Sequence, residues 1–339
     1  MVDLRRWGAM FNRPLANVTI KRFSGFEMPE PAPIRTLGRH DYIVTDRSVG
    51  GDAPKDFIGV YEPGHAHRNR PGKWPTYIAK VGHQWYPAES ITEQLMTVIG
   101  QTLGLRMAQS KLVIADRQIR FMSKYFLAKD QSLDHGAQIV AGYLADESFV
   151  KDVEAQGVER DIFTFQVLCD AIRTRFPPNH LEILRDFVRM IAFDALVGNQ
   201  DRHLYNWGVI SDARGPSVPR FSPIYDTARG LFWNTDEDGL ASYQRSETLD
   251  KYIRKSTPLI GWDSAQARTP NHFDLVQHVV ECKPEYRPVL AVLGGPIALA
   301  SVGKQIDRKF GNLLSVPRLD LIKECLRRRF ELFTTAVGV

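Results

Sequence analysis

The stretch Gly198-Asn199-Gln200-Asp201-Arg202-His203-Leu204-Tyr205-Asn206-Trp207-Gly208 brings Asn, Asp and His side chains together directly after a long apolar segment. Its central pattern is D-x-x-x-x-N, from Asp201 to Asn206. A second acidic signal, Tyr225-Asp226, ends a short hydrophobic run further along the chain. Phosphoryl transfer needs one carboxylate to orient the acceptor hydroxyl, and an Asn and a second Asp to hold the metal beside the phosphates. The stretch therefore predicts a phosphotransferase.

The composition is that of an ordinary globular protein that can bury a sizeable core: 339 residues, 43% hydrophobic and 24% charged. The net charge of +5 suits a polyanionic ligand such as ATP and is too weak to indicate direct nucleic-acid binding. The three cysteines are far apart and form no CxxC pair, which disfavours a zinc site or a disulfide framework. Residues 1–15 contain no secretory leader, and no uncharged run approaches a membrane span. We therefore expect a cytoplasmic protein without a membrane partner.

The first part of the chain predicts a small sheet with one helix. Strands are expected at 42–44, 57–61 and 76–81, and a hairpin at 111–122. Apolar residues recur at helical spacing from Ser90 to Leu103. The first two strands are separated by Ser48-Val49-Gly50-Gly51-Asp52-Ala53-Pro54-Lys55. Two adjacent glycines let backbone N–H groups approach an anion, and Lys55 can add charge, although a plain turn is an equal alternative.

Two charged residues in this part are ambiguous. Lys80 ends an apolar strand, where an ammonium group needs an anionic partner or must reach out to solvent at the strand edge. Glu93 fits the capping box Ser90-x-x-Glu93, and it can instead pair with Lys80 and hold it on the phosphates. Glu89 can take either role in its place.

The order of elements predicts an α+β, two-lobed, protein-kinase-like fold. Its parts are an N-lobe over 1–126, a small antiparallel sheet with one helix, and a mainly helical C-lobe over 127–339. Residues 127–175 are interpreted as helices with loops, and Leu181–Val197 as a long helix that stops at Gly198. Short strands are expected at 207–210 and 221–224. The run Arg327-Arg328-Arg329 is interpreted as a solvated face.

The candidate site residues have distinct expected roles. Lys80 holds the α- and β-phosphates, and Asp201 orients the acceptor hydroxyl and accepts its proton. Asn206 and Asp226 chelate Mg²⁺, which prefers oxygen ligands, while His203 and Tyr225 brace the loop or touch phosphate. Taken singly, each residue has a structural alternative as a turn former or cap. Their conjunction in this order favours the kinase interpretation.

The motifs resemble those of the HipA-like bacterial serine/threonine kinases. The matching segments span roughly residues 40–235: Ser48 to Lys55 for the Gly-rich loop, Tyr77-Ile78-Ala79-Lys80 for the ATP lysine, Glu93 with Leu103-Gly104-Leu105 for the helix, Gly198 to Asn206 for the catalytic loop, and Pro223-Ile224-Tyr225-Asp226 for the metal-binding end. The D-R-H-x-x-N form also occurs in phosphoinositide-kinase-like folds. The Gly-Gly-x-x-Pro-Lys stretch favours the HipA-like alternative.

The resemblance implies further features of the site and its partners. It implies ATP and Mg²⁺ as cofactors, adenine contacts from the backbone near Ser123 and Tyr125, and phosphate contacts from Gly50, Gly51, Asp52, Ala53, Pro54 and Lys55. It also implies autophosphorylation of Ser48, which would eject the Gly-rich loop and switch the kinase off. Typical members carry an additional N-terminal domain that contacts an antitoxin. Only about forty residues precede the loop here, which disfavours a standard antitoxin complex. We therefore expect as partner a small antitoxin or a HipS/HipB-like chain that carries the missing domain.

Several functions compete on the sequence alone. The leading one is a protein Ser/Thr kinase of the toxin–antitoxin type that acts on a translation component, a target given by family analogy. The alternatives are a phosphoinositide-like lipid or small-molecule kinase, a regulatory pseudokinase or interaction module, and, more remotely, a nuclease built on Asp201 and His203. Retention of Lys80, Asp201, Asn206 and Asp226 argues against a pseudokinase.

Overall fold

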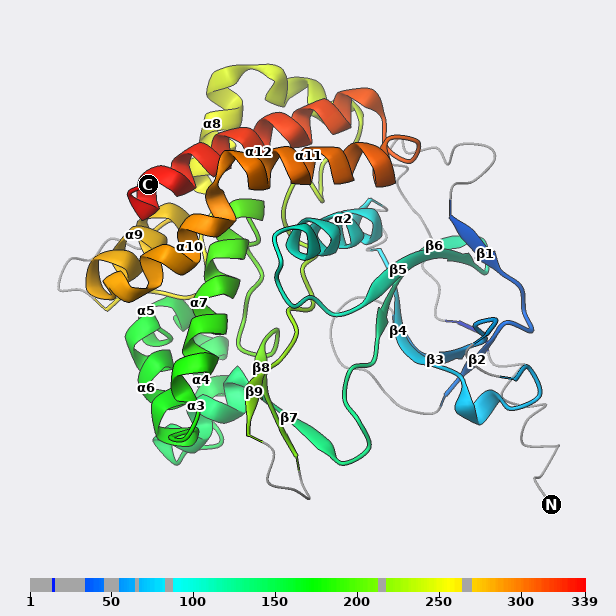
Figure 1. Cartoon of the computed structure of the whole chain (residues 1–339), viewed down its shortest axis with the longest axis horizontal. Helices are drawn as coiled ribbons and strands as arrows, with labels where there is room; N and C mark the ends of the chain where they lie inside the picture. Colours follow the sequence, from blue (N-terminus) through cyan, green and yellow to red (C-terminus); the bar gives the residue numbers. More distant parts are fainter. Residues whose placement is uncertain are drawn as a thin grey trace.

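The strands β1–β6 gather at one end of the molecule and most helices at the other, with the helix α2 (Glu89–Thr102) between them (Figure 1). The computed structural model describes residues 14–15, 34–45, 55–64, 67–82, 88–212, 218–263 and 270–339. The predicted α+β, two-lobed architecture is confirmed. A sheet with one helix forms the first lobe, and the second lobe is mainly helical.

Within these residues, six strands form one sheet in the order β1–β5–β6–β4–β3–β2. All neighbouring strands are antiparallel except β1 and β5, which run parallel. The short edge strand β1 therefore joins a mainly antiparallel sheet by a parallel pairing with β5. The strands are β1 (Arg35–Leu37), β2 (Tyr42–Val44), β3 (Lys55–Val60), β4 (Thr76–Val81), β5 (Ser110–Ala115) and β6 (Gln118–Lys124).

The alternation of strand β4 positions the first site residue. Tyr77, Ala79 and Val81 are buried, while the intervening residues are partly open. Because successive strand side chains point to opposite faces, Ile78 and Lys80 share the other face, and both line the cleft between the lobes.

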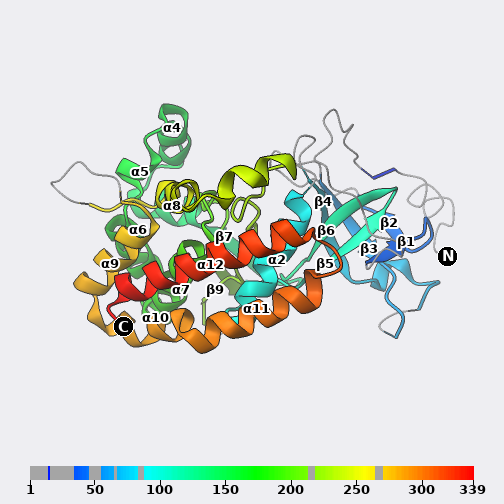
Figure 2. The ribbon, with the colours of Figure 1, turned by 90° about the horizontal axis from the view of Figure 1, so that it is seen from above.

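Helix α2 lies against the sheet on one side and against the C-terminal lobe on the other. It contacts β5, β6 and the helix α11 (Pro296–Phe310), and α11 runs beside it in two perpendicular views (Figures 1 and 2). Most of α2 is therefore buried, including the polar residues Thr92, Glu93 and Thr97. Gly104 follows its end with a φ of 73°, a left-handed conformation that favours glycine.

The capping-box alternative for Ser90 and Glu93 is wrong. The N-cap of α2 is Ala88, whose side chain cannot cap, so Ser90 lies inside the first turn rather than before it. The side chain of Glu93 is therefore not used at the helix start, and it points to Lys80 on the neighbouring strand.

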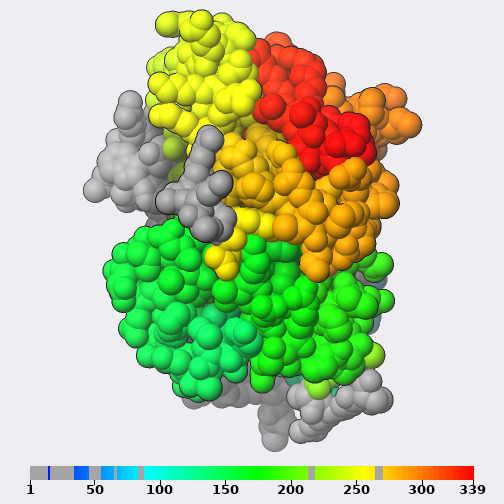
Figure 3. Space-filling view, turned by 90° about the vertical axis from the view of Figure 1, so that its left-hand side faces the viewer, coloured from blue at the N-terminus to red at the C-terminus, as the bar shows by residue number. Residues whose placement is uncertain are grey.

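The second lobe is organised around α7 (His180–Val197). The first half of α7 alternates between buried and exposed residues, whereas every residue from Met190 to Val197 is buried. The other helices of this lobe are α3 (Gly136–Leu144), α4 (Phe149–Gln156), α5 (Glu159–Ile162), α6 (Phe165–Arg175), α8 (Ser246–Lys255), α9 (His272–Cys282), α10 (Arg287–Gly294), α11 and α12 (Val316–Val337), with 3-10 turns at Asp238–Gln244 and Pro284–Tyr286. A further 3-10 turn, Pro71–Lys73, lies between β3 and β4 in the first lobe. Figure 3 shows the outer face of this lobe, with residues of α3–α7 in green and the C-terminal helices in orange and red.

The interpretation of residues 127–175 as only helices and loops is corrected by the strand β7 (Gln131–His135). β7 pairs with β8 (Gly208–Asp212), which pairs with β9 (Arg220–Phe221), giving three described strands in a second sheet. β7 has no apolar alternation, and its partner β8 is distant in the sequence. Its strand form depends on pairing across the fold rather than on local pattern.

The interpretation of Arg327-Arg328-Arg329 as a solvated face is wrong for Arg329. Arg327 and Arg328 pair with Glu324 at the surface, but Arg329 is 1% exposed. Its Nε donates to the carbonyl oxygen of Ala195 at 2.9 Å, near the end of α7. A guanidinium group at a helix C-terminus satisfies carbonyls that have no partner in the helix and interacts favourably with the helix dipole.

The described residues contain no single helix with the length and hydropathy of a membrane span. One bent pair, Pro284–Gly294 with Pro296–Phe310, meets that test when its two helices are taken together.

Candidate active site

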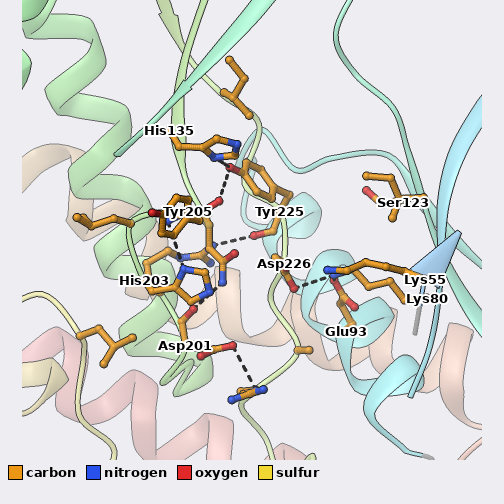
Figure 4. Close-up of a pocket in the computed structure, with 18 of the residues that line it drawn as sticks. Lys55, Lys80, Glu93, Ser123, His135, Asp201, His203, Tyr205, Tyr225 and Asp226 are labelled. Atoms are coloured by element: carbon orange, nitrogen blue, oxygen red, sulfur yellow. Dashed lines mark hydrogen bonds and ion pairs between the residues drawn. The ribbon is translucent and has the colours of Figure 1, made fainter. Parts of the chain in front are cut away.

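Lys80, Glu93 and Asp226 form a charged cluster where β4, α2 and the Pro223–Asp226 segment meet (Figure 4). Lys80 Nζ lies 2.9 Å from Glu93 Oε1 and 2.7 Å from Asp226 Oδ1. Two carboxylates therefore share one ammonium group. The sequence predicted Lys80 with Glu93, but the direct contact of Lys80 with Asp226 was not predicted.

The backbone conformation of Asp226 and a backbone pairing two residues before it place this side chain in the cluster. Asp226 has a φ of 53°, an uncommon conformation for a residue that is not glycine. Two residues earlier, Ile224 exchanges backbone hydrogen bonds with the Arg106–Ala108 segment of the first lobe. These two backbone features bring the carboxylate of Asp226, in the second lobe, next to Lys80 in the first lobe.

The charge imbalance of the cluster shifts its pKa values. Burial alone would lower the pKa of Lys80, but Asp226 and Glu93 together raise it above its ordinary value. Burial raises the pKa of Glu93 to about 7, against the opposing effect of Lys80. Burial also acts upward on Asp226, but Lys80 and then Lys55 hold the pKa of this carboxyl at about 2. Lys55 stands opposite Lys80 in the β3–β4 register. The cluster keeps Asp226 as the ionised member.

The catalytic-loop stretch begins where α7 ends at Gly198. Gly198 has a φ of 69°, and its N–H donates to the carbonyl oxygen of Asp194. A Cβ at this position would lie 2.9 Å from Arg329 Cζ. A larger residue at position 198 would therefore meet both backbone strain and the buried guanidinium.

Arg202 ties three segments of the site together. Its Nε and Nη2 donate to the two carboxylate oxygens of Asp194 at 2.8 and 2.9 Å. Its Nη1 donates to the carbonyl oxygens of Asn206 and Tyr225, both at 2.7 Å. The sequence motif gave no role to Asp194 or Arg202. Together they hold the catalytic loop against the residue that precedes Asp226.

Asn206 faces the cleft with a fixed amide. Its Nδ2 donates to the backbone carbonyl of Asp201 at 2.8 Å, which leaves Oδ1 as the atom available to a metal. One amide oxygen and the Asp226 carboxylate are a donor set that suits Mg²⁺, which commonly takes one or two protein oxygens together with phosphates and water. The residues present therefore fit the ion expected from the sequence.

The carboxylate of Asp201 is half-buried and lies 3.3 Å from Arg229 Nε, an ion pair drawn as a dashed line in Figure 4. Burial raises the pKa of Asp201, while Arg229 and His203 act in the opposite direction. A carboxylate with a raised pKa is a better proton acceptor near neutral pH. Arg229 was not predicted, because no sequence signal distinguishes it from other arginines.

His203 and Tyr225 brace the loop through an aromatic cluster. His203 Nδ1 accepts the N–H of Tyr205, and the hydroxyl of Tyr225 donates to the Tyr205 carbonyl oxygen at 3.0 Å. The same hydroxyl lies 3.0 Å from Nδ1 of His135 in β7, whose pKa is lowered by burial. His135 was missed because β7 was missed. A phosphate contact by His203 or Tyr225 stays a prediction.

These groups line one cleft of about 980 Å³ between the lobes. Ser123 and Tyr125 also line it, and Ser123 lies on the Lys80 side, across from the Asp201 loop (Figure 4). Their contact with adenine stays a prediction. The backbone N–H groups of Lys124 and Tyr125 already donate to Gln109 and Thr76. Contacts from this segment to a base would then come from its other backbone groups. Ser48 and Gly50, Gly51, Asp52, Ala53 and Pro54 lie outside the described residues.

The fold and this cleft define a two-lobed, protein-kinase-like domain, with a lysine–glutamate pair on one lobe and an Asp…Asn loop on the other. The sequence matches the family described as HipA-like C-terminal domain over residues 47–282. The chain belongs to this family, as its motifs indicated.

Two solved structures resemble this chain in fold. One is the proinflammatory kinase CtkA of Helicobacter pylori, with a TM-score of 0.69 and 17% identity, covering 91% of this chain and 99% of that chain. The other is HipA of Shewanella oneidensis MR-1, solved with HipB and operator DNA, with a TM-score of 0.51 and 14% identity. That match covers 86% of this chain and 65% of that one. No curated protein matches the sequence.

Proposed function

We propose that this protein is an ATP-dependent protein serine/threonine kinase of HipA type. The observation that carries the proposal is that Lys80, Asp201, Asn206 and Asp226, which come from both lobes, all line one cleft. Phosphoryl transfer depends mainly on positioning and charge neutralisation, and these residues supply both. Membership of the HipA-like family and the similarity to the H. pylori kinase support the same conclusion.

In the proposed reaction Asp201 orients the acceptor hydroxyl and takes its proton. The hydroxyl oxygen forms a bond to the γ-phosphorus of ATP while the bond to the β,γ-bridging oxygen breaks, and ADP leaves with that electron pair. Lys80, held by Glu93, neutralises the α- and β-phosphates. Asn206 and Asp226 would hold Mg²⁺, which supplies further charge neutralisation at the phosphates. For this to happen, Lys80 must loosen its contact with Asp226 as the nucleotide binds.

The finer parts of the proposal are the acceptor, the regulation and the partners. We infer a cytoplasmic kinase whose substrate is a protein, with a translation component as the target class. Autophosphorylation of Ser48 would place nearly two negative charges beside the ATP phosphates and disfavour nucleotide binding. A small antitoxin or HipS/HipB-like chain is the proposed partner, because a HipA protein similar in fold was solved with HipB.

The test is phosphate transfer from γ-labelled ATP by the purified protein in the presence of Mg²⁺. We expect wild-type protein to label itself and the Asp201→Asn variant to remain unlabelled. Asp320→Asn, at an exposed position on α12, is the matched control and should label like wild type. Absence of labelling together with absence of an ATP-dependent thermal shift would favour a pseudokinase instead.

Two further measurements resolve the finer parts. A phosphopeptide map should place phosphate at Ser48, and phosphate found only elsewhere would contradict the loop-ejection switch. Phosphoproteomics of cells that express wild type or Asp201→Asn should reveal protein sites that depend on Asp201. If only lipids or small molecules are labelled, the lipid or small-molecule kinase alternative replaces the protein kinase.

A further inference from the structure

Arg229 is held beside Asp201 by the backbone of its own segment, three residues after Asp226. Its carbonyl oxygen accepts the N–H of Gln200 in the catalytic loop at 3.1 Å. The next residue, Gly230, passes so close to α7 that a Cβ there would lie 2.6 Å from the carbonyl oxygen of Val197. The position of Arg229 relative to Asp201 is therefore set by two contacts between main chains.

Two contacts orient the side chain of Arg229, and they leave part of its guanidinium group without a hydrogen-bond partner among the described residues. Its Nε lies 3.3 Å from Asp201 Oδ2, and its Cζ lies 5.4 Å from the ring centre of Trp233. The side chain is 39% exposed, and it lines the cleft. Its Nη1 and Nη2 make no hydrogen bond to the residues that the structure describes. The terminal N–H groups of the guanidinium remain available to a ligand in the cleft.

Two other cationic side chains of the cleft, Arg202 and Lys80, already have hydrogen-bond partners. Arg202 is 2% exposed, and its guanidinium donates to four oxygen atoms. Lys80 is engaged by Glu93 and Asp226 at the other end of the cleft. Near Asp201, where the phosphoryl group would be transferred to the acceptor, two arginines line the described cleft. Of these two, Arg229 is the one whose Nη1 and Nη2 make no hydrogen bond to the described residues.

We propose that Arg229 is a catalytic arginine that contacts the γ-phosphoryl group of ATP during transfer while it holds Asp201 in place. This inference rests on the proposed kinase function and adds a residue to it. As the acceptor oxygen bonds to the γ-phosphorus and the bond to the ADP oxygen breaks, negative charge spreads over the three remaining phosphoryl oxygens. An arginine supplied by the same chain can stabilise this charge. The acceptor proton still passes to Asp201.

A simpler role for Arg229 would be a brake that occupies Asp201 until the acceptor displaces it. The two roles predict opposite kinetics. Loss of a brake leaves the rate unchanged or raises it, whereas loss of a transition-state contact lowers kcat without weakening ADP binding, since ADP lacks the γ-phosphate.

The experiment compares wild type with Arg229→Ala and Arg229→Lys, and uses Arg254→Ala, at an exposed position on α8, as the control. Phosphate transfer from γ-labelled ATP is measured to the protein itself and to myelin basic protein. We expect kcat to fall about 10²–10³-fold in Arg229→Ala, the range found when one transition-state donor is removed. Arg229→Lys should recover part of the rate, because it keeps the charge and loses the fork of donors.

Nucleotide binding is a second readout that a merely structural role would not reproduce. Thermal shifts with Mg²⁺ and either ADP or the non-hydrolysable analogue AMP-PNP separate the γ-phosphate contact from the rest of the site. In Arg229→Ala we expect AMP-PNP affinity to fall about tenfold, as for loss of a hydrogen bond to a charged group, and ADP affinity to stay unchanged. This comparison works even if wild-type protein transfers no phosphate, an outcome that would contradict the proposed function.

The proposal is overturned if Arg229→Ala transfers phosphate at the wild-type rate or faster. It is also overturned if kcat falls only together with ADP affinity and melting temperature.

Discussion

Two buried ion-pair systems lie on either side of the Tyr225–Asp226 segment, and their charge balances differ. Lys80 is shared by two carboxylates, those of Glu93 and Asp226. Arg202 instead meets the single carboxylate of Asp194 and donates from Nη1 to two backbone carbonyl oxygens. The first system places two acidic groups on one ammonium group, and the pKa of Glu93 is raised to about 7, while the second pairs one carboxylate with one guanidinium group that donates to four oxygen atoms.

For the proposed kinase, this difference predicts which contacts would change on nucleotide binding. Breaking the buried ion pair of Asp194 and Arg202 would leave an uncompensated buried charge, which costs several kcal/mol of stability, so the same pairing is expected with and without ligand. These two residues therefore serve as a fixed frame. An unbalanced cluster is ready to accept a further positive charge. Under the proposed function, Asp226 would hold Mg²⁺ in place of its contact with Lys80, and Lys80 would then be available to the phosphates. The lysine cluster is therefore the exchangeable part of the site, and the arginine pair is the part that holds it in position.

The largest effect is expected from removing the fixed frame. Asp194→Ala leaves Arg202 buried without its carboxylate, and we expect the free energy of unfolding to fall by about 3–5 kcal/mol. Denaturant unfolding measures this change. The control is Asp186→Ala on the same helix, where the ion pairs with Arg106 and Arg189 are partly exposed. That variant should lose less than about 1 kcal/mol. Equal losses in the two variants would show that Asp194 and Arg202 are not a special frame.

The next effect falls on activity rather than stability. Lys80→Met should lower phosphate transfer about 10²–10³-fold, because it removes the positive group from the phosphates. Its unfolding free energy should change less than that of Asp194→Ala, since Glu93 can take up a proton and Asp226 is about a third exposed. Transfer kinetics and unfolding are measured on the same preparations, with Lys323→Met at a surface ion pair as the control. A wild-type rate in Lys80→Met would contradict the assignment of the lysine.

The smallest effect is a pH dependence specific to Glu93. Its pKa is about 7 in the folded protein, above the ordinary 4.5, so the folded state binds the proton more tightly. Stability from this group is therefore present at low pH and is lost as the pH rises from about 4.5 to about 7. Asp226 does not mask this slope, because its lowered pKa makes it titrate near pH 2.

Glu93→Gln removes that slope. Relative to wild type, the variant should gain about 1–3 kcal/mol of stability between about pH 5 and about pH 8, following 1.36 kcal/mol for each pKa unit. Melting temperatures of both proteins across this range measure the difference. Parallel curves for the two proteins would mean that Glu93 does not titrate in this window.

The sequence was sufficient to predict the local geometry of those candidate site residues that belong to a motif or a local pattern. Alternation in β4 turns Lys80 to the cleft face. The spacing from Asp201 to Asn206 allows the amide of Asn206 to bond the backbone of Asp201. Gly198 ends α7 in a left-handed conformation that glycine adopts without strain. Each of these depends on neighbours within a few residues along the chain.

Only the tertiary structure showed which charged groups meet. Lys80 and Asp226 are separated by 146 positions, and Arg329 reaches α7 from 134 positions away. Nothing in the sequence near Arg229, His135 or Arg329 distinguishes them from surface residues of the same type. The sequence allowed Glu93 to be either a helix-capping residue or the partner of Lys80. The position of α2 next to Lys80 of β4 in the fold selects the second role. The reason is physical: the interaction of a charged side chain depends on its partner and its burial, and the folded chain sets both.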